Sequence, residues 1–161
     1  GVRDFLPFLE ALRRGQWDTH GHRLALLGSL FRDSMPGYLH KLPPHVTYNL
    51  SLPYRHFYAA LSRSLALLPL FAPQHMLSKA SAAVPASLIC NVPLIAPASL
   101  PHTYSYYPAD ALWVHDDSTA PHEALAAVPP GAAGEVALRP RLEALERARR
   151  RIYTDNRALV R

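Results

Sequence analysis

The sequence has a single cysteine, Cys90, and only seven glycines among its 161 residues. One cysteine excludes an internal disulfide framework and any zinc site built from several cysteines. Few glycines leave little material for loops that cradle phosphates, and neither a glycine-rich nucleotide motif nor G-x-S-x-G occurs. Cys90 stands in the apolar stretch 88–92, which disfavours a reactive thiolate. We therefore expect no catalytic residues, no enzymatic activity, no small-molecule substrate and no cofactor.

Charged residues and long hydrophobic runs are scarce as well. Only 18% of the residues are charged, below the roughly 25% of an average soluble domain. No apolar run reaches the roughly 18 residues that a membrane-spanning helix needs. Proline is abundant instead, with 16 residues, about twice its usual share of roughly 5%. A chain of this length suits one domain, and its composition is typical of a protein that partners cover and that does not fold alone.

The periodicity of apolar residues predicts a mainly α fold. Short amphipathic helices are expected over 4–14 and 20–33, joined as an antiparallel hairpin, and a stronger helix over 53–68. The proline-containing segment 36–53 is expected to be an extended connection, within which residues 46–50 could pair as a short edge strand. The expected fold is therefore a small irregular helical unit with long extended, proline-rich connections and a C-terminal basic helix.

The middle of the chain is rich in proline and nearly uncharged. Residues 64–109 contain seven prolines and one charged residue, Lys79. Prolines at this density break long helices and are rejected from central strands, whereas disordered segments are usually more polar. We therefore predict that residues 69–109 run extended along a partner. The side chains expected to pack on that partner are Leu88, Ile89, Tyr104, Tyr106 and Tyr107. Stacking of the tyrosines on nucleic-acid bases is an alternative, although aromatic clusters are more often protein interfaces.

The net charge of +5 lies at the C-terminal end. Residues 1–135 are neutral overall, whereas residues 136–161 carry eight arginines against three acidic residues. Between the two parts, residues 110–135 are expected to hold a short helix near 121–127 and then a flexible break rich in proline and glycine. The positive charge is therefore a local feature of the tail.

The tail is predicted to be a helix over about 138–154 with a continuous apolar stripe. Two acid-first pairs four residues apart, Glu143 with Arg147 and Glu146 with Arg150, support it. The arginines expected to contact RNA phosphates are Arg141, Arg149, Arg151, Arg157 and Arg161. Alternatives are a solvated helix face with internal ion pairs and, less well supported because acids share the polar face, binding to a membrane surface.

Histidines are numerous enough to require a search for metal sites. His20 and His22 flank a glycine, and a second polar group follows Trp113. The second group consists of His115, Asp116, Asp117, His122 and Glu123. Its spacing matches no established zinc or di-metal pattern, and residues of these types commonly cap helices in loops. We expect no metal site.

Four segments are expected: a helical N-terminal unit (1–68), an extended partner-wrapping segment (69–109), a short helix with a linker (110–135) and the basic helix (136–161). Together they suggest a structural accessory subunit of a large ribonucleoprotein, in particular a mitochondrial ribosome, with neighbouring proteins and rRNA as partners. The alternative is a supernumerary subunit of a respiratory complex or ATP synthase, for which membrane contact stays open. The sequence begins with Gly1, which is compatible with removal of an initiator or targeting segment, and nothing in it resembles a signal peptide.

Overall fold

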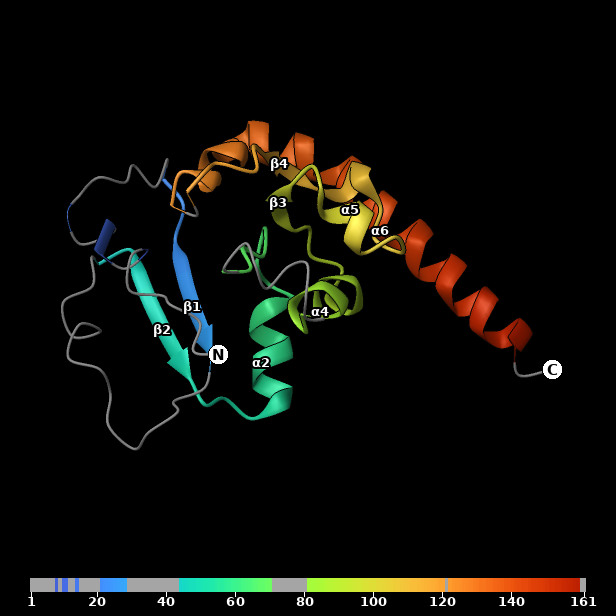
Figure 1. The fold of residues 1–161 in the computed structure, drawn as a ribbon. Coiled ribbons are helices and arrows are strands. Elements are labelled where there is room, and N and C mark those ends of the chain that lie inside the picture. Colours follow the sequence, from blue (N-terminus) through green and yellow to red (C-terminus); the bar gives the residue numbers. More distant parts are fainter. Residues whose placement is uncertain are drawn as a thin grey trace.

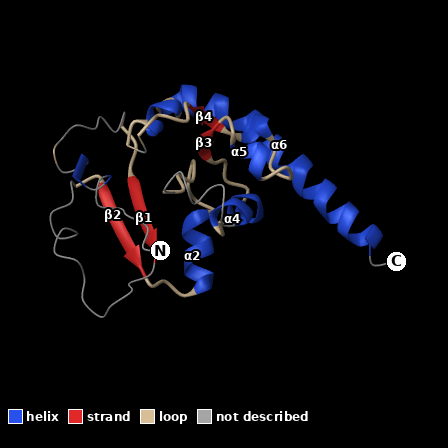
Figure 2. Ribbon diagram, in the orientation of Figure 1, coloured by secondary structure: helices blue, strands red, loops and turns tan. Residues whose placement is uncertain are grey.

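The computed structural model of the protein describes residues 8, 10–11, 14, 21–28, 44–70, 81–120 and 122–159. Within these ranges it delimits four α-helices, two 3-10 helices and four short strands (Figure 1). The strands pair two by two, and the longest helix lies along one side of the molecule (Figure 2). The fold is therefore small and mixed: helices are prominent in it, but short strands bring distant parts of the chain together.

Strands β1 (Leu24–Gly28) and β2 (Val46–Leu50) form a parallel pair in which Leu24 is opposite Val46. The helix expected over 20–33 is therefore wrong at residues 24–28. A five-residue apolar run is too short for its periodicity to separate a strand from a helix. The β-branched and aromatic residues of β2 favour a pleated strand. Pairing with β2 makes residues 24–28 a strand as well.

Helix α2 (Tyr54–Leu61) is shorter than the helix predicted over 53–68. At its end the hydroxyl of Ser62 donates to the carbonyl oxygen four residues earlier, at 2.8 Å, a local bond that competes with continued helix. The chain then turns inward, because Leu67 pairs with Leu94 in a parallel β-bridge. The long-range bridge thus overrides the helical periodicity that continues to residue 68.

The central part of the chain contains five short elements. They are α4 (Ala83–Cys90), β3 (Ile95–Pro97), α5 (Leu100–Thr103), the 3-10 helix η2 (Ala109–Ala111) and β4 (Trp113–His115). Strand β3 runs parallel to β4, with Ile95 opposite Trp113. The prolines limit each element to a few residues without preventing it. Residues 81–109 therefore carry elements of their own where an extended course was expected, while residues 71–80 lie outside the described part.

The main core lies between these elements and the C-terminal helix. Its fully or almost fully buried members are Val84, Leu88, Leu94, Ala96, Leu100, Tyr104, Tyr107, Ala111, Leu112, Ala144, Leu145 and Ala148. A smaller cluster beneath it joins Leu61 of α2 to Ala86 and Val92, with Leu27 of β1 at its edge. The nearly uncharged middle of the chain is thus apolar largely because it supplies the protein's own core.

Helix α6 (Gly131–Leu159) begins earlier than the helix predicted over 138–154. At about 1.5 Å per residue its 29 residues span about 43 Å. Gly134 allows the start, because a side chain there would overlap with the carbonyl group of Pro129. The flexible break expected before the tail is thus partly replaced by a closely packed helix start. No helix in the described ranges is both long and apolar enough to cross a bilayer.

Two other predicted helices have different outcomes. The short helix expected near 121–127 is present as the 3-10 helix η3 (Ala124–Ala127). The helix expected over 4–14 lies mostly outside the described residues, although residues 8, 10 and 11 are helical. Nothing in the described structure tests the division of the chain into four segments, which stays a prediction. The main core does join residues of three of these segments.

Candidate nucleic-acid interface

Helix α6 contacts the rest of the protein from its second turn, where Ala137 and Leu138 pack on a cluster around Trp113, as far as Ile152. Ala144, Leu145 and Ala148 are at most 6% exposed and belong to the main core, and Ile152 packs against its edge. Beyond this point the described side chains from Tyr153 to Ala158 are all exposed. Figure 1 shows the C-terminal end of α6 extending away from the other elements. We call residues 149–159 the basic arm.

Arg141 lies outside the arm, and its guanidinium group contacts other residues of the same chain. Its Nε donates to the carbonyl oxygen of Leu112 at 3.0 Å, and its Nη1 donates to that of Ala137 at 2.6 Å. The guanidinium carbon also lies 3.8 Å from the centre of the Trp113 ring, a cation–π contact. Burial lowers the pKa of Arg141, although a guanidinium stays protonated at neutral pH. Arg141 therefore holds α6 on β4, a role that its sequence context did not reveal.

Three further arginines form exposed ion pairs. Arg147 binds Asp110 at 2.9 Å, so it pairs with η2 instead of with the Glu143 predicted from the helical spacing. Glu146 accepts from Arg150 at 3.0 Å, as predicted, and from Arg149 at 3.4 Å. Exposed pairs of this kind stabilise by about 0.2–1 kcal/mol each and exchange readily with other anions. Arg149 and Arg150 therefore remain available to a stronger anionic partner.

Arg151 and Arg157 have no such partner among the described residues. Both are exposed, and neither forms an ion pair or hydrogen bond with any residue that the structure describes. Arg161, the last arginine of the predicted set, lies outside the described residues. Residues 149–159 carry four arginines against one acidic residue, Asp155, so the arm keeps a net positive charge that is concentrated at 149–151. Of the five arginines predicted to contact RNA, the structure places Arg149, Arg151 and Arg157 on one projecting element.

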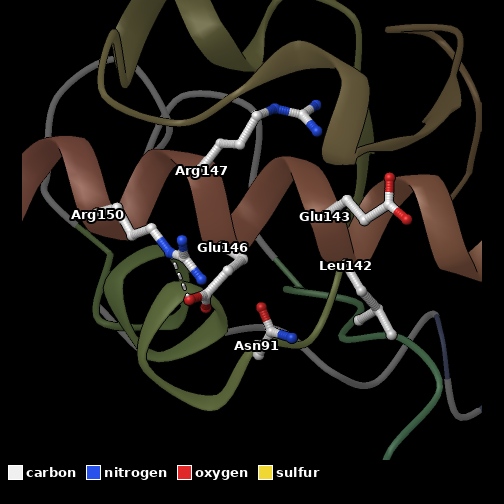
Figure 3. A pocket seen from close by; sticks show the side chains of 6 residues that line it. All are labelled: Asn91, Leu142, Glu143, Glu146, Arg147 and Arg150. Carbon is white, nitrogen blue, oxygen red and sulfur yellow. Dashed lines mark hydrogen bonds and ion pairs between the residues drawn. The ribbon is translucent and has the colours of Figure 1, made fainter.

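A surface pocket of about 600 Å³ lies where α6 passes the end of α4. Figure 3 shows its lining residues, Asn91, Leu142, Glu143, Glu146, Arg147 and Arg150. Two acidic and two basic side chains line it, and Glu146 is already paired with Arg150. The lining contains no nucleophile and no histidine that could act as a base. The pocket therefore offers no recognisable catalytic arrangement.

The histidine and aspartate group that begins at the end of β4 is held by hydrogen bonds to nearby residues. Ser99 donates to Asp117 at 2.8 Å, and a ring nitrogen of His115 lies 2.8 Å from the carbonyl oxygen of Asp116. Over the described ranges, no three His, Cys, Asp or Glu side chains come close enough to share a metal ion. His22 lies instead 3.1 Å from the carbonyl oxygen of Val128, joining β1 to η3, and His20 is not described. The described members, His22, His115 and Asp117, thus form contacts within and between loops.

The residues predicted to pack on a partner fall into two groups. Leu88, Tyr104 and Tyr107 are at most 6% exposed within the chain's own core. Ile89 and Tyr106 are exposed, at 62% and 36%. Leu88 and Ile89 differ because adjacent residues of a helix point about 100° apart, but the sequence of α4 is apolar on nearly all sides and gives no signal that separates them. Only Ile89 and Tyr106 are therefore placed where a neighbouring protein can reach them.

Comparison with protein-family models, with curated proteins and with solved structures found no match to this chain. Any function assigned to it must therefore rest on the arrangement of its own residues.

Proposed function

We propose that the protein is a structural accessory subunit of a large ribonucleoprotein, in particular of a mitochondrial ribosome, and that its basic arm contacts rRNA. The observation that carries the proposal is the arm itself. It projects from the core, its described side chains after Ile152 are all exposed, and it retains positive charge that the described residues do not neutralise.

A helix end without core contacts has little reason to persist in water. Most helical stability in proteins comes from the packing of an apolar face, and a helix that is polar on all sides needs another source of support. Contact with a partner along the arm supplies that support. Because Arg151 and Arg157 form no ion pair with any described residue, the partner that fits best is anionic.

Arginine favours phosphate among the anions that a structural partner could present. Its planar guanidinium donates two parallel hydrogen bonds to phosphate oxygens, and it is more weakly hydrated than the lysine ammonium group. Contacts to phosphates position a protein on folded RNA without reading its sequence. The anchoring of α6 by Leu145 and Arg141 keeps the arm in a fixed direction, which suits a structural contact.

The proposal is tested by tagging the protein in its own cells and following its sedimentation with ribosomal subunits before and after ribonuclease. We expect it to travel with the subunits and to be released when the RNA is cut. The double variant Arg151→Gln, Arg157→Gln should be released at a lower salt concentration, because each lost phosphate contact reduces the salt-dependent part of binding. Arg23→Gln with Arg139→Gln is the charge-matched control, since both side chains are exposed and lie off the arm.

Two outcomes contradict the proposal. Sedimentation with a membrane complex that ignores ribonuclease would favour a supernumerary subunit of a respiratory complex or ATP synthase. Equal release of the arm variant and the control would mean that the arm is not an RNA contact.

A further inference from the structure

Helix α2 presents an aromatic ring to solvent in a defined orientation. Tyr54 is 83% exposed, the highest value among the exposed large hydrophobic side chains of the described chain. Its ring is stacked on that of Tyr58, with the centroids 6.4 Å apart and the planes within 18° of parallel. The outer face of Tyr54 is therefore open, and a third flat ring placed there would continue the stack.

The inner side of the helix fixes this arrangement. Leu61 is 1% exposed, and Phe57 and Tyr58 pack on the small cluster that joins α2 to α4. Phe57 also meets Tyr58 edge to face at 5.4 Å. Tyr58 is thus held by the core, and it holds Tyr54 in turn. A stacking surface that exists before binding costs little ordering entropy when a ligand arrives.

Basic side chains occur on α2 and in the turn that follows it. Arg55 and Arg63 are exposed and form no ion pair with any described residue, and His56 is exposed beside them. The sequence contains no Asp or Glu between Asp33 and Asp110. The stretch of sequence around α2 therefore offers these arginines no local counter-ion, and the helix surface attracts anions without acidic neighbours that would repel them.

We infer that α2 and the turn that follows it bind single-stranded RNA, with a base stacked on Tyr54 and phosphates contacted by Arg55 and Arg63. Single strands combine an exposed flat base with a charged backbone, and proteins bind them through aromatic stacking beside basic groups. Bases within a duplex are stacked on each other and cannot reach the ring. The inference rests on the proposed function in that RNA is the partner, but it concerns a second surface, separate from the basic arm.

The test uses the purified full-length chain and a fluorescein-labelled 12-nucleotide oligouridine, with binding followed by fluorescence anisotropy over a range of salt concentrations. Tyr54→Ala should weaken binding about 5- to 150-fold, the loss that removal of one stacking ring causes. Tyr54→Phe should bind like the unchanged protein, because the stacking face is kept. Tyr106→Ala is the control for an exposed tyrosine elsewhere.

The arginines give an independent readout. Arg55→Gln with Arg63→Gln should reduce the slope of log affinity against log salt by about 1.4, since each phosphate contact to a single strand contributes about 0.7. Circular dichroism of each variant checks that the fold is kept, which the exposure of these side chains predicts. If α2 instead docks on a protein, none of these RNA-binding values would change, and the inference would be wrong.

The outcomes separate this inference from the proposed function. If Tyr54→Ala binds as tightly as the unchanged protein, or if no RNA is bound, the role of α2 is wrong, while sedimentation with ribonuclease still decides the assembly. If only the arm variant Arg151→Gln, Arg157→Gln loses binding, the arm is the RNA contact and α2 is not. Should the chain aggregate in isolation, ultraviolet cross-linking of the tagged complex replaces the titration, and nucleotide adducts confined to residues outside 54–63 would contradict the inference.

Discussion

At the scale of single residues, the hydroxyl group of Tyr107 ties three parts of the core together. It accepts a hydrogen bond from the amide of Leu94 at 3.1 Å and lies 2.8 Å from Oγ of Ser87, which in turn donates to the carbonyl of Val92. Desolvation by burial raises the pKa of Tyr107 to about 12, although both hydrogen bonds lower it in part. The phenol is therefore a neutral structural group at physiological pH.

Tyr107→Phe should lower the free energy of unfolding by about 1–3 kcal/mol, because the amide of Leu94 is left buried without a partner. Urea denaturation measures the change, and Tyr106→Phe is the control at an exposed position. An equal effect of the two substitutions would show that the hydroxyl of Tyr107 is not needed.

The raised pKa of Tyr107 also predicts a dependence on pH. The folded protein keeps this proton while the unfolded chain, with a tyrosine pKa near 10, loses it, so this contribution to stability is complete below pH 10. It declines as the pH rises from about 10 towards 12, by at most about 1.4 kcal/mol per pH unit. Stability measured by urea at pH 9 and pH 11 should therefore fall more in the unchanged protein than in Tyr107→Phe. A parallel fall in both proteins would contradict this assignment.

Arg141→Ala should lower the free energy of unfolding by about 1–3 kcal/mol, since it removes two hydrogen bonds from a charged donor and the contact with Trp113. Arg141→Lys should recover only part of the loss, because an ammonium group cannot form the planar fork. Arg139→Ala, two residues away and exposed, is the matched control and should change stability by less than about 0.5 kcal/mol. Denaturation curves followed by tryptophan fluorescence provide the comparison.

At the scale of elements, the start of α6 reverses the usual effect of a glycine substitution. In an ordinary helix interior, glycine to alanine stabilises by about 0.5–1 kcal/mol. Gly134→Ala should instead destabilise the protein, because the new methyl group would overlap with backbone atoms of Pro129 that cannot move aside cheaply. The calorimetric melting temperature should fall for Gly134→Ala and change little for the control Ala132→Ser, which lies exposed at the helix start. An increase for Gly134→Ala would show that the helix can begin elsewhere.

The elements differ in how far the sequence can predict them. The tail helix and α2 are predictable because their apolar spacing is local, and the pair Glu146–Arg150 follows from helical geometry alone. The strands depend on partners far along the chain, such as Leu67 with Leu94, and no local pattern announces a pairing of that kind.

The residues of the candidate site differ in the same way. The local excess of charge is enough to identify Arg149, Arg151 and Arg157 as arginines of the tail helix, and the structure places them on the projecting arm. The charge pattern cannot show that Arg141 differs from the other tail arginines, because its contact residue Trp113 belongs to another element. The sequence also does not predict that Tyr54 is exposed, since the exposure of an aromatic residue at the first turn of a helix depends on what packs around that turn.

At the scale of the whole molecule, the protein divides its length between a core and an arm. Deleting residues 153–161 should leave the urea midpoint unchanged, because every side chain described from 153 to 158 is exposed. The same deletion should lower the salt concentration at which the protein is released from RNA, since it removes Arg157 while Arg149 and Arg151 remain. A large loss of stability would show that the arm belongs to the folding unit and would weaken the proposal that it is an interaction element.

The place of α6 in the chain has a consequence for biosynthesis. Ala144, Leu145 and Ala148 close a core whose other members lie between Val84 and Leu112, and the strands in it are parallel, so no local hairpin can form first. At about 5–20 residues per second, translation delivers the closing helix a few seconds after the surface that it covers. During that interval the nascent chain exposes an apolar face to the compartment in which it is made, and holding chaperones bind faces of this kind.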